Sequence, residues 1–277
     1  MGRSLDRPGR APPADKAAGC RGNLRDIPLR KRLGRPHTFH VVHRGNLRRV
    51  VGASVVVTLL AALMAFYVAD RAGAGATRCQ QHRVEARERQ SIVTGDGEQV
   101  LVIGDSWSVG LGQEDLVRSW PSRLPGRVHV AGFSGSGFSA SASSCGHVSF
   151  HARAATAVAA VRPRLVVVEG GLNDFDRTDA AIERGFRALM VDLAAEQVVV
   201  VGPAAAPSRV AAVPRVDGVL ARLCDEYGVP YIPTDDLDLD YLDDDLHLTE
   251  DGHAEFGDAV AERIAAVDPA RPVVLLP

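Results

Sequence analysis

Three side chains in the sequence have the types and the spacing that serine hydrolysis requires. Ser106 follows a short apolar run and precedes Gly110, so a helix starting there would direct its positive N-terminal end at the serine oxygen. Asp244 lies three residues before His247, which allows its carboxylate to bind the ring Nδ1 and leaves Nε2 to accept a serine proton. The pattern predicts a nucleophile, a base and an orienting acid.

A serine hydrolase also needs hydrogen-bond donors for the negative oxygen that forms during acyl transfer. We expect three donors: the backbone N–H groups of Ser106 and Gly135 and the side-chain amide of Asn173. Gly135 and Asn173 belong to polar, Gly-rich segments at 132–137 and 170–174, and each segment begins where an apolar run stops.

Five short apolar runs rich in Val and Ile are bounded by Gly or Pro, as buried parallel strands are. They are residues 100–103, 128–131, 165–169, 198–201 and 229–232. Helical segments are expected at 116–124, within 151–161, and at 180–196, 215–227 and 250–267. The alternation predicts a doubly wound α/β sheet, which binds its ligand beyond the carboxyl ends of the strands. The polar segments lie at those ends.

Four motifs resemble the sequence blocks of the SGNH (GDSL-type) hydrolase superfamily, and they follow the order of that family. They are Gly104-Asp105-Ser106-Trp107-Ser108, Gly132-Phe133-Ser134-Gly135, Gly171-Leu172-Asn173-Asp174 and Asp244-Asp245-Leu246-His247. The pair Trp120-Pro121 also resembles one that is frequent in the helix after the first block. The resemblance covers most of residues 98–265.

The resemblance implies a flavodoxin-like three-layer α/β/α domain with a five-stranded parallel sheet. It also implies Ser106 as nucleophile, His247 as general base and then acid, and Asp244 as its orienting residue. The resemblance also implies the same three oxyanion donors: Ser106, Gly135 and Asn173. The sequence departs from the family at Val130, where Asn is common, and at Gly137, where Thr is common; both departures concern the shape of the substrate site.

Each motif has an ordinary structural alternative. A Gly-Asp-Ser sequence is a common turn, Asn173 and Asp174 are typical helix-capping residues, and the glycines of the second block suit backbone turns. Four motifs in order at strand ends favour the catalytic interpretation. His253 lies within the final expected helix, and we expect it to be structural.

Three rival sites are less consistent with the sequence. Residues 135–140 match a dinucleotide-binding pattern, but no acidic residue lies within 150–168 to bind a ribose. A G-x-S-x-G nucleophile elbow does not occur. A metal site would leave the serine unexplained and has no H-E-x-x-H frame; the residues considered for it are Asp243, Asp244, Asp245, His247 and His253, and separately His37, His40 and His43. No metal or organic cofactor is expected.

The charge distribution divides the chain into two parts. Residues 1–49 hold 13 Lys and Arg against three acids, whereas the rest of the chain has a balance of −12. The acidic part argues against nucleic acid as a ligand, because phosphate binding needs clustered cations. The basic part is rich in Pro and Gly without apolar periodicity, so we expect a disordered basic cytoplasmic tail.

Residues 50–69 contain no charge, and a helix of this length spans about 30 Å of hydrocarbon. Arg44, Arg48 and Arg49 flank its start, which predicts a cytoplasmic N-terminus and an extracytoplasmic remainder. The alternative is a signal peptide cleaved near residues 72–74, with secretion. We expect a stalk at 70–97, with a short helix at 81–90, and a hydrolase domain at 98–277.

The cysteines fit an oxidising compartment outside the membrane. We expect Cys79 to pair with Cys145, and Cys224 to lie in the core on the apolar face of its helix. The sequence as a whole predicts a membrane-anchored serine esterase acting on carboxylic esters, such as O-acetyl or lipid esters of the cell envelope. The alternatives are an acyltransferase that uses the same triad and a non-catalytic envelope-binding module.

Overall fold

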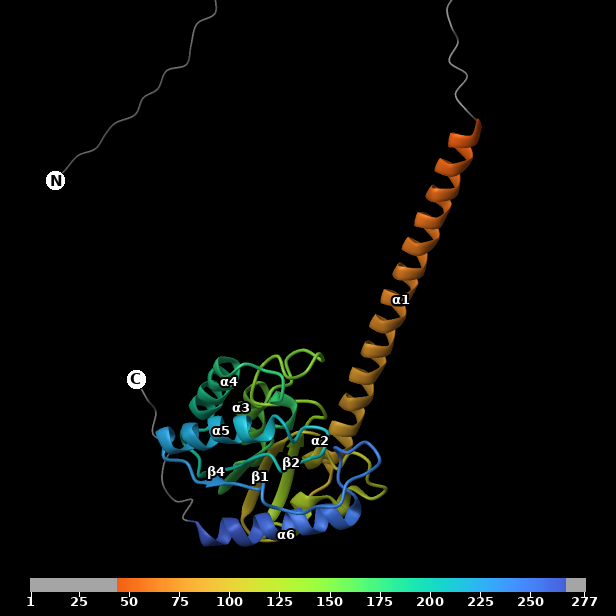
Figure 1. Cartoon of the computed structure of the whole chain (residues 1–277). Helices are drawn as coiled ribbons and strands as arrows, with labels where there is room; N and C mark the ends of the chain where they lie inside the picture. Colours follow the sequence, from red (N-terminus) through yellow and green to blue (C-terminus); the bar gives the residue numbers. More distant parts are fainter. Residues whose placement is uncertain (1–43, 268–277) are drawn as a thin grey trace, which may run out of the picture. The chain divides into compact units, whose positions relative to one another are not determined.

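The structure, a computed structural model, describes residues 44–267 (Figure 1). Helix α1 runs without interruption from Arg44 to Ser91. The helix therefore continues through most of the expected stalk and is longer than the short helix expected at 81–90. Residues 70–91 lack Pro and are rich in Ala, Arg, Gln and Glu, which favour helix. Most of the expected basic tail, residues 1–43, lies outside the described residues.

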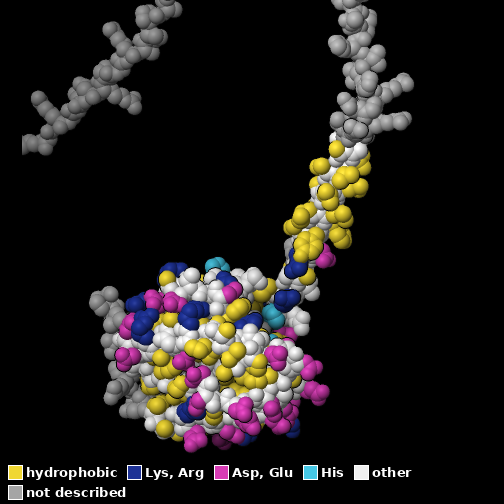
Figure 2. Space-filling view, in the orientation of Figure 1, with side chains coloured by type: hydrophobic (Ala, Val, Ile, Leu, Met, Phe, Trp, Pro, Cys, Tyr) yellow, Lys and Arg dark blue, Asp and Glu magenta, His cyan; other side chains and the backbone are white. Residues whose placement is uncertain are grey.

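Helix α1 is long and apolar enough to cross a membrane. Its candidate span begins at Gly52, and the most apolar 18-residue window has a mean hydropathy of 2.2 with none of it buried. Side chains along this part, such as Leu63 and Phe66, are more than 60% exposed, and Figure 2 shows hydrophobic side chains gathered along the helix. A signal sequence passes the same test of length and apolar composition.

The sheet has the predicted five parallel strands, in the order β2-β1-β3-β4-β5. The strands are β1 (Gln99–Gly104), β2 (Arg127–Gly132), β3 (Leu165–Glu169), β4 (Val198–Val201) and β5 (Tyr231–Ile232). Strand β5 begins two residues later than expected, since Pro230 has no N–H to donate to the ladder. The strand order reverses between β1 and β3, where a doubly wound sheet opens a crevice at the carboxyl ends.

The helices are close to those expected, with one exception. They are α2 (Ser106–Val109), α3 (Phe150–Val161), α4 (Asp179–Asp192), α5 (Val213–Tyr227) and α6 (Glu250–Ala266), with a 3₁₀ turn at Leu172–Asp174. The segment expected as a helix at 116–124 instead forms two 3₁₀ turns, Leu116–Arg118 and Trp120–Arg123. Pro121 interrupts the helical hydrogen bonding there and disfavours helix at the residue before it.

Two apolar cores cover the two faces of the sheet. Strand residues such as Leu101 and Val166 pack with α3, α4 and α5, which lie together on one face (Figure 1). Neighbouring residues such as Val100 and Val167 pack against α6, on the other face. The alternation follows the pleat of each strand and confirms the three-layer α/β/α architecture.

A disulfide joins the last turns of α1 to the loop that follows β2. Cys79 and Cys145 are bonded with their Cα atoms 5.3 Å apart, as predicted, and Cys224 is free and buried. Arg83 also donates to the Cys145 carbonyl at 3.1 Å, and the His82 ring meets Phe133 edge to face. The end of α1 is therefore held against the α/β domain by a disulfide, a hydrogen bond and an aromatic contact.

Candidate active site

The turn that carries Ser106 is formed where β1 leads directly into the one-turn helix α2. Asp105 caps this helix, because its carboxylate accepts the backbone N–H of Trp107 at 3.0 Å. Gly110 ends the helix in the left-handed conformation, with φ 84°, which glycine adopts without strain. The Ser106 side chain thus lies at the carboxyl end of β1, beside the point where the strand order reverses.

The structure brings Ser106, His247 and Asp244 together. Ser106 Oγ lies 3.1 Å from His247 Nε2, and His247 Nδ1 lies 2.6 Å from Asp244 Oδ2. Partial burial alone would raise the pKa of Asp244, but hydrogen bonds from the amide and ring of His247 and the amide of Leu246 lower it. Asp244 is therefore ionised at neutral pH and fixes one tautomer of the His247 ring.

The loop that carries His247 is tied to the segment that follows Ser106 by hydrogen bonds on either side of the histidine. The Trp107 indole N–H donates to the Leu246 carbonyl at 3.0 Å, and the Gln113 side-chain amide donates to the Leu248 carbonyl at 3.1 Å. Trp107 is in turn buried against Phe256 of α6. These contacts align two segments that are far apart in the sequence.

The three expected oxyanion donors differ in their surroundings. Gly135 has a φ of 79°, a backbone conformation that other residues rarely adopt, and it lies on the loop after β2. The Nδ2 amide of Asn173 donates to Asp105 Oδ2 at 3.0 Å and to the Ser136 carbonyl at 2.9 Å. Both amide hydrogens of Asn173 are therefore engaged in this conformation, so donation to an oxyanion requires one of these bonds to be shared or released.

Asp174 is a buried anchor that the sequence did not identify beyond a possible cap. Its two carboxylate oxygens accept the backbone N–H groups of Phe138 and Ser139, each at 2.9 Å. Burial raises the pKa of Asp174 to about 7, although these two bonds oppose the rise. Asp174 holds the loop after β2 against the turn that carries Asn173.

Arg153 of α3 was also missed by the sequence analysis, where it reads as an ordinary helix residue. Its guanidinium donates to the Gly104 carbonyl and to Ser136 Oγ at 3.0 and 2.9 Å, so it joins the end of β1 to the loop after β2. Burial lowers the pKa of Arg153 to about 10, and the charge of Asp105 opposes this effect. Burial raises the pKa of Asp105 to about 6, although the hydrogen bond from the Trp107 amide opposes the rise.

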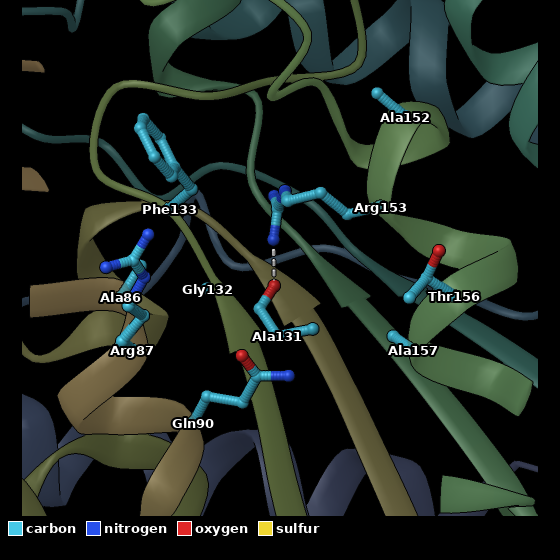
Figure 3. A pocket seen from close by; sticks show the side chains of 10 residues that line it. All are labelled: Ala86, Arg87, Gln90, Ala131, Gly132, Phe133, Ala152, Arg153, Thr156 and Ala157. Atoms are coloured by element: carbon cyan, nitrogen blue, oxygen red, sulfur yellow. Dashed lines mark hydrogen bonds between the residues drawn. The ribbon is translucent and has the colours of Figure 1, made fainter. Parts of the chain in front are cut away.

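Arg153 also lines a cavity of about 280 Å³ between the last turns of α1, the end of β2 and α3. Figure 3 shows its guanidinium bonded to the Ala131 carbonyl, with Arg87 and Phe133 across the cavity. Ser106 and His247 do not line this cavity. The cavity is therefore distinct from the candidate active site.

The acidic and histidine residues near the C-terminus do not converge on a metal. Within residues 44–267, no three His, Cys, Asp or Glu side chains are placed to hold one. His253 is 1% exposed, and its Nδ1 accepts the Trp120 backbone N–H at 3.4 Å. Burial lowers the pKa of His253 to about 4, so this ring is neutral. It is buried where α6 packs against Trp120.

The sequence model of the GDSL-like Lipase/Acylhydrolase family matches residues 102–255. The chain belongs to this family. The match contains Ser106, Asn173 and His247 and extends over more than half of the chain, and it makes the chain an ester hydrolase. No curated protein matches the sequence.

Solved structures similar to this member of the family have the same α/β fold. A carbohydrate acetylesterase from Sinorhizobium meliloti is 22% identical, with a TM-score of 0.52 over 61% of this chain and 99% of that one. The aryl esterase of M. smegmatis is 19% identical, with a TM-score of 0.51 over 61% of this chain and 99% of its own. At sequence identities of 22% and 19%, the similarity shows that the fold is shared.

Proposed function

We propose that this ester hydrolase acts through a Ser106-His247-Asp244 triad. The observation that carries the proposal is the unbroken hydrogen-bonded series from Ser106 Oγ to His247 Nε2 and from His247 Nδ1 to Asp244, at 3.1 and 2.6 Å. A serine hydroxyl is a weak nucleophile until an adjacent base removes its proton. His247 is positioned to do so, and Asp244 stabilises the imidazolium that results.

The reaction then proceeds in two steps. Ser106 Oγ attacks the acyl carbonyl carbon while His247 takes the hydroxyl proton, and the protonated ring passes that proton to the leaving alcohol. The backbone N–H groups of Ser106 and Gly135, with the Asn173 amide, hold the negative oxygen. Water attacks the acyl-enzyme with His247 again as base, which releases the carboxylic acid and restores the serine.

We further propose that α1 anchors the enzyme in a membrane with the α/β domain on the extracytoplasmic side. Support comes from the apolar run at 50–69, the arginines that precede it and the acids Asp70 and Glu85 that follow it. A disulfide at Cys79 fits an oxidising compartment. Extraction by detergent but not by alkaline carbonate would support the anchor, whereas a mature N-terminus near residue 75 would establish cleavage.

The proposed substrates are O-acetyl or lipid esters of the cell envelope. The first of the similar solved structures is named a carbohydrate acetylesterase, and an extracytoplasmic site would face envelope glycans and lipids. Acetylated glycans and lysophospholipids should therefore be compared as substrates for the purified full-length chain in detergent.

The triad is tested with p-nitrophenyl acetate and longer esters on the wild type and on Ser106→Ala. Loss of at least about 10⁴-fold in kcat is expected, because the nucleophile is removed. Ser119→Ala is a matched control, since it deletes another buried serine hydroxyl, bonded to the Leu116 carbonyl. Equal turnover in Ser106→Ala would refute the nucleophile. No turnover in any protein would favour a binding module, and acylated acceptor in place of free acid would indicate acyl transfer.

A further inference from the structure

A third buried carboxyl group, besides those of Asp105 and Asp174, contacts the turn that carries Ser106. Glu169 is the last residue of β3, is 2% exposed and takes no part in the triad. Ser108 Oγ donates to Glu169 Oε2 at 2.6 Å. The site is tightly packed, because a Cβ added at Gly104 would lie 2.0 Å from Ser108 Oγ and 2.8 Å from Glu169 Oε2. Gly104 leaves the space in which this hydrogen bond forms.

Helix α2 depends on contacts of this kind for its orientation. It has only four residues, so its internal hydrogen bonds are few, and helices of this length are not stable by themselves. Side chains on both sides of Ser106 hold it: Asp105 caps it, Trp107 bonds to the His247 loop and Ser108 bonds to Glu169. Ser106 stands on the same turn, and rotation of the turn would move its Oγ away from His247.

We propose that Glu169 is a positioning residue for Ser106. Through Ser108 Oγ its carboxyl group fixes the rotation of α2 and so keeps Ser106 Oγ within hydrogen-bonding distance of His247 Nε2. The inference rests on the proposed triad and adds to it a residue from strand β3 that touches neither the substrate nor the reacting atoms. A displacement of about 1 Å at a reacting group lowers a rate by about 100-fold, so this role is measurable.

The surroundings of Glu169 favour its neutral form. Burial raises the pKa of Glu169 well above its usual range, the neighbouring Asp105 raises it further, and the bonds from Ser108 and other donors only partly oppose this. A neutral acid and a glutamine have nearly the same shape, and both have a carbonyl oxygen that can accept the hydrogen bond from Ser108 as well as a group that donates. Glutamine should therefore replace Glu169 in this role, whereas alanine should not.

The test compares Glu169→Gln, Glu169→Ala, Ser108→Ala and the double variant Ser108→Ala/Glu169→Ala in the full-length chain, with p-nitrophenyl acetate as substrate. We expect Glu169→Gln to keep kcat within about threefold of the wild type. Glu169→Ala and Ser108→Ala should each lower kcat by about 10- to 100-fold with KM changed less than about threefold. The double variant should be no worse than the poorer single variant, because both changes remove one interaction.

The test needs an activity control, a check that each variant is folded, and a separate check on Ser106. Ser119→Ala should keep wild-type kcat, and thermal unfolding should show that each variant compared is folded. If Glu169→Ala does not fold, Ser108→Ala and Glu169→Gln decide the matter. Wild-type kcat in folded Ser108→Ala, or equal losses in folded Glu169→Gln and Glu169→Ala, would overturn the positioning role. Undiminished turnover in Ser106→Ala would instead overturn the triad itself.

Discussion

Asp244 binds His247 at two points: one carboxylate oxygen accepts its backbone N–H at 2.9 Å, and the other meets its ring Nδ1 at 2.6 Å. The Asp244 side chain is 50% exposed, whereas that of His247 is 15% exposed. The Asp244 carboxylate therefore holds the His247 imidazole from the solvent side. Because the pair is local, its removal should affect catalysis more than folding.

Asp244→Asn should lower kcat by about 10³- to 10⁴-fold, since an amide can hold the imidazole in the wrong tautomer. Stability should change by less than about 1 kcal/mol, because the side chain is half exposed. The neighbouring Asp243→Asn is the matched control and should keep wild-type kcat. Ester turnover and thermal unfolding measure the two effects, and similar kcat values for both variants would contradict the role of Asp244.

Asn173→Ala should lower kcat by about 10²- to 10³-fold, the loss expected for one oxyanion donor. Asn173 also bonds to Asp105 and to the Ser136 carbonyl, so its unfolding free energy must be measured alongside kcat. A folded Asn173→Ala enzyme with kcat within threefold of the wild type would show that its amide serves only the Asp105 and Ser136 contacts.

Replacement of both Cys79 and Cys145 by Ser should lower the unfolding free energy of the domain by about 2–4 kcal/mol. The disulfide closes 66 residues of sequence, so its loss increases the freedom of the unfolded chain. Chemical denaturation of the full-length chain in detergent measures the change, and dithiothreitol should produce the same change in the wild type. Unaltered stability after both treatments would be inconsistent with a stabilising crosslink.

Stability should fall as pH rises from about 4 to about 7, in part because of Asp174. Burial raises the folded-state pKa of this group to about 7, whereas an unfolded Asp has a pKa of about 3.9. In that window the folded chain keeps a proton that the unfolded chain has released, so the group's contribution is fully present below pH 4 and is lost by pH 7.

Asp174→Asn should reduce this slope while lowering stability at every pH, since one backbone N–H of the loop loses its acceptor. Denaturation curves at half-unit pH steps separate the slope from the offset. The exposed Asp243→Asn is again the control. A slope identical to that of the wild type would mean that Asp174 is ionised throughout the window.

Cys224 should resist thiol reagents in the folded enzyme. Burial raises the pKa of its thiol, and the thiolate is the reactive species. In a Cys20→Ser background, iodoacetamide should leave the native chain unmodified and label one site after denaturation in urea. Labelling of the native chain at a comparable rate would place Cys224 at an accessible position.

The local features of the fold follow from local sequence. Runs of Val and Ile between Gly and Pro define strands because only an extended, buried backbone suits them, and the polar residues after each run then fall on one edge of the sheet. Asp244 and His247 can be paired from their spacing alone. The disulfide was inferred from the number of cysteines and from the apolar face on which Cys224 lies.

The long-range contacts were decided only by the tertiary structure. Ser106 and His247 are 141 residues apart, and their meeting depends on the hydrogen bonds of Trp107 and Gln113 to a distant loop. Glu169 reads in sequence as the polar end of a strand, and Arg153 as one residue of an alanine-rich helix. Their roles arise from burial beside Gly104, and burial depends on how all the elements pack. The sequence by itself determined which side chains form the candidate site, because residue type and strand ends are local; packing alone determined which buried groups hold them.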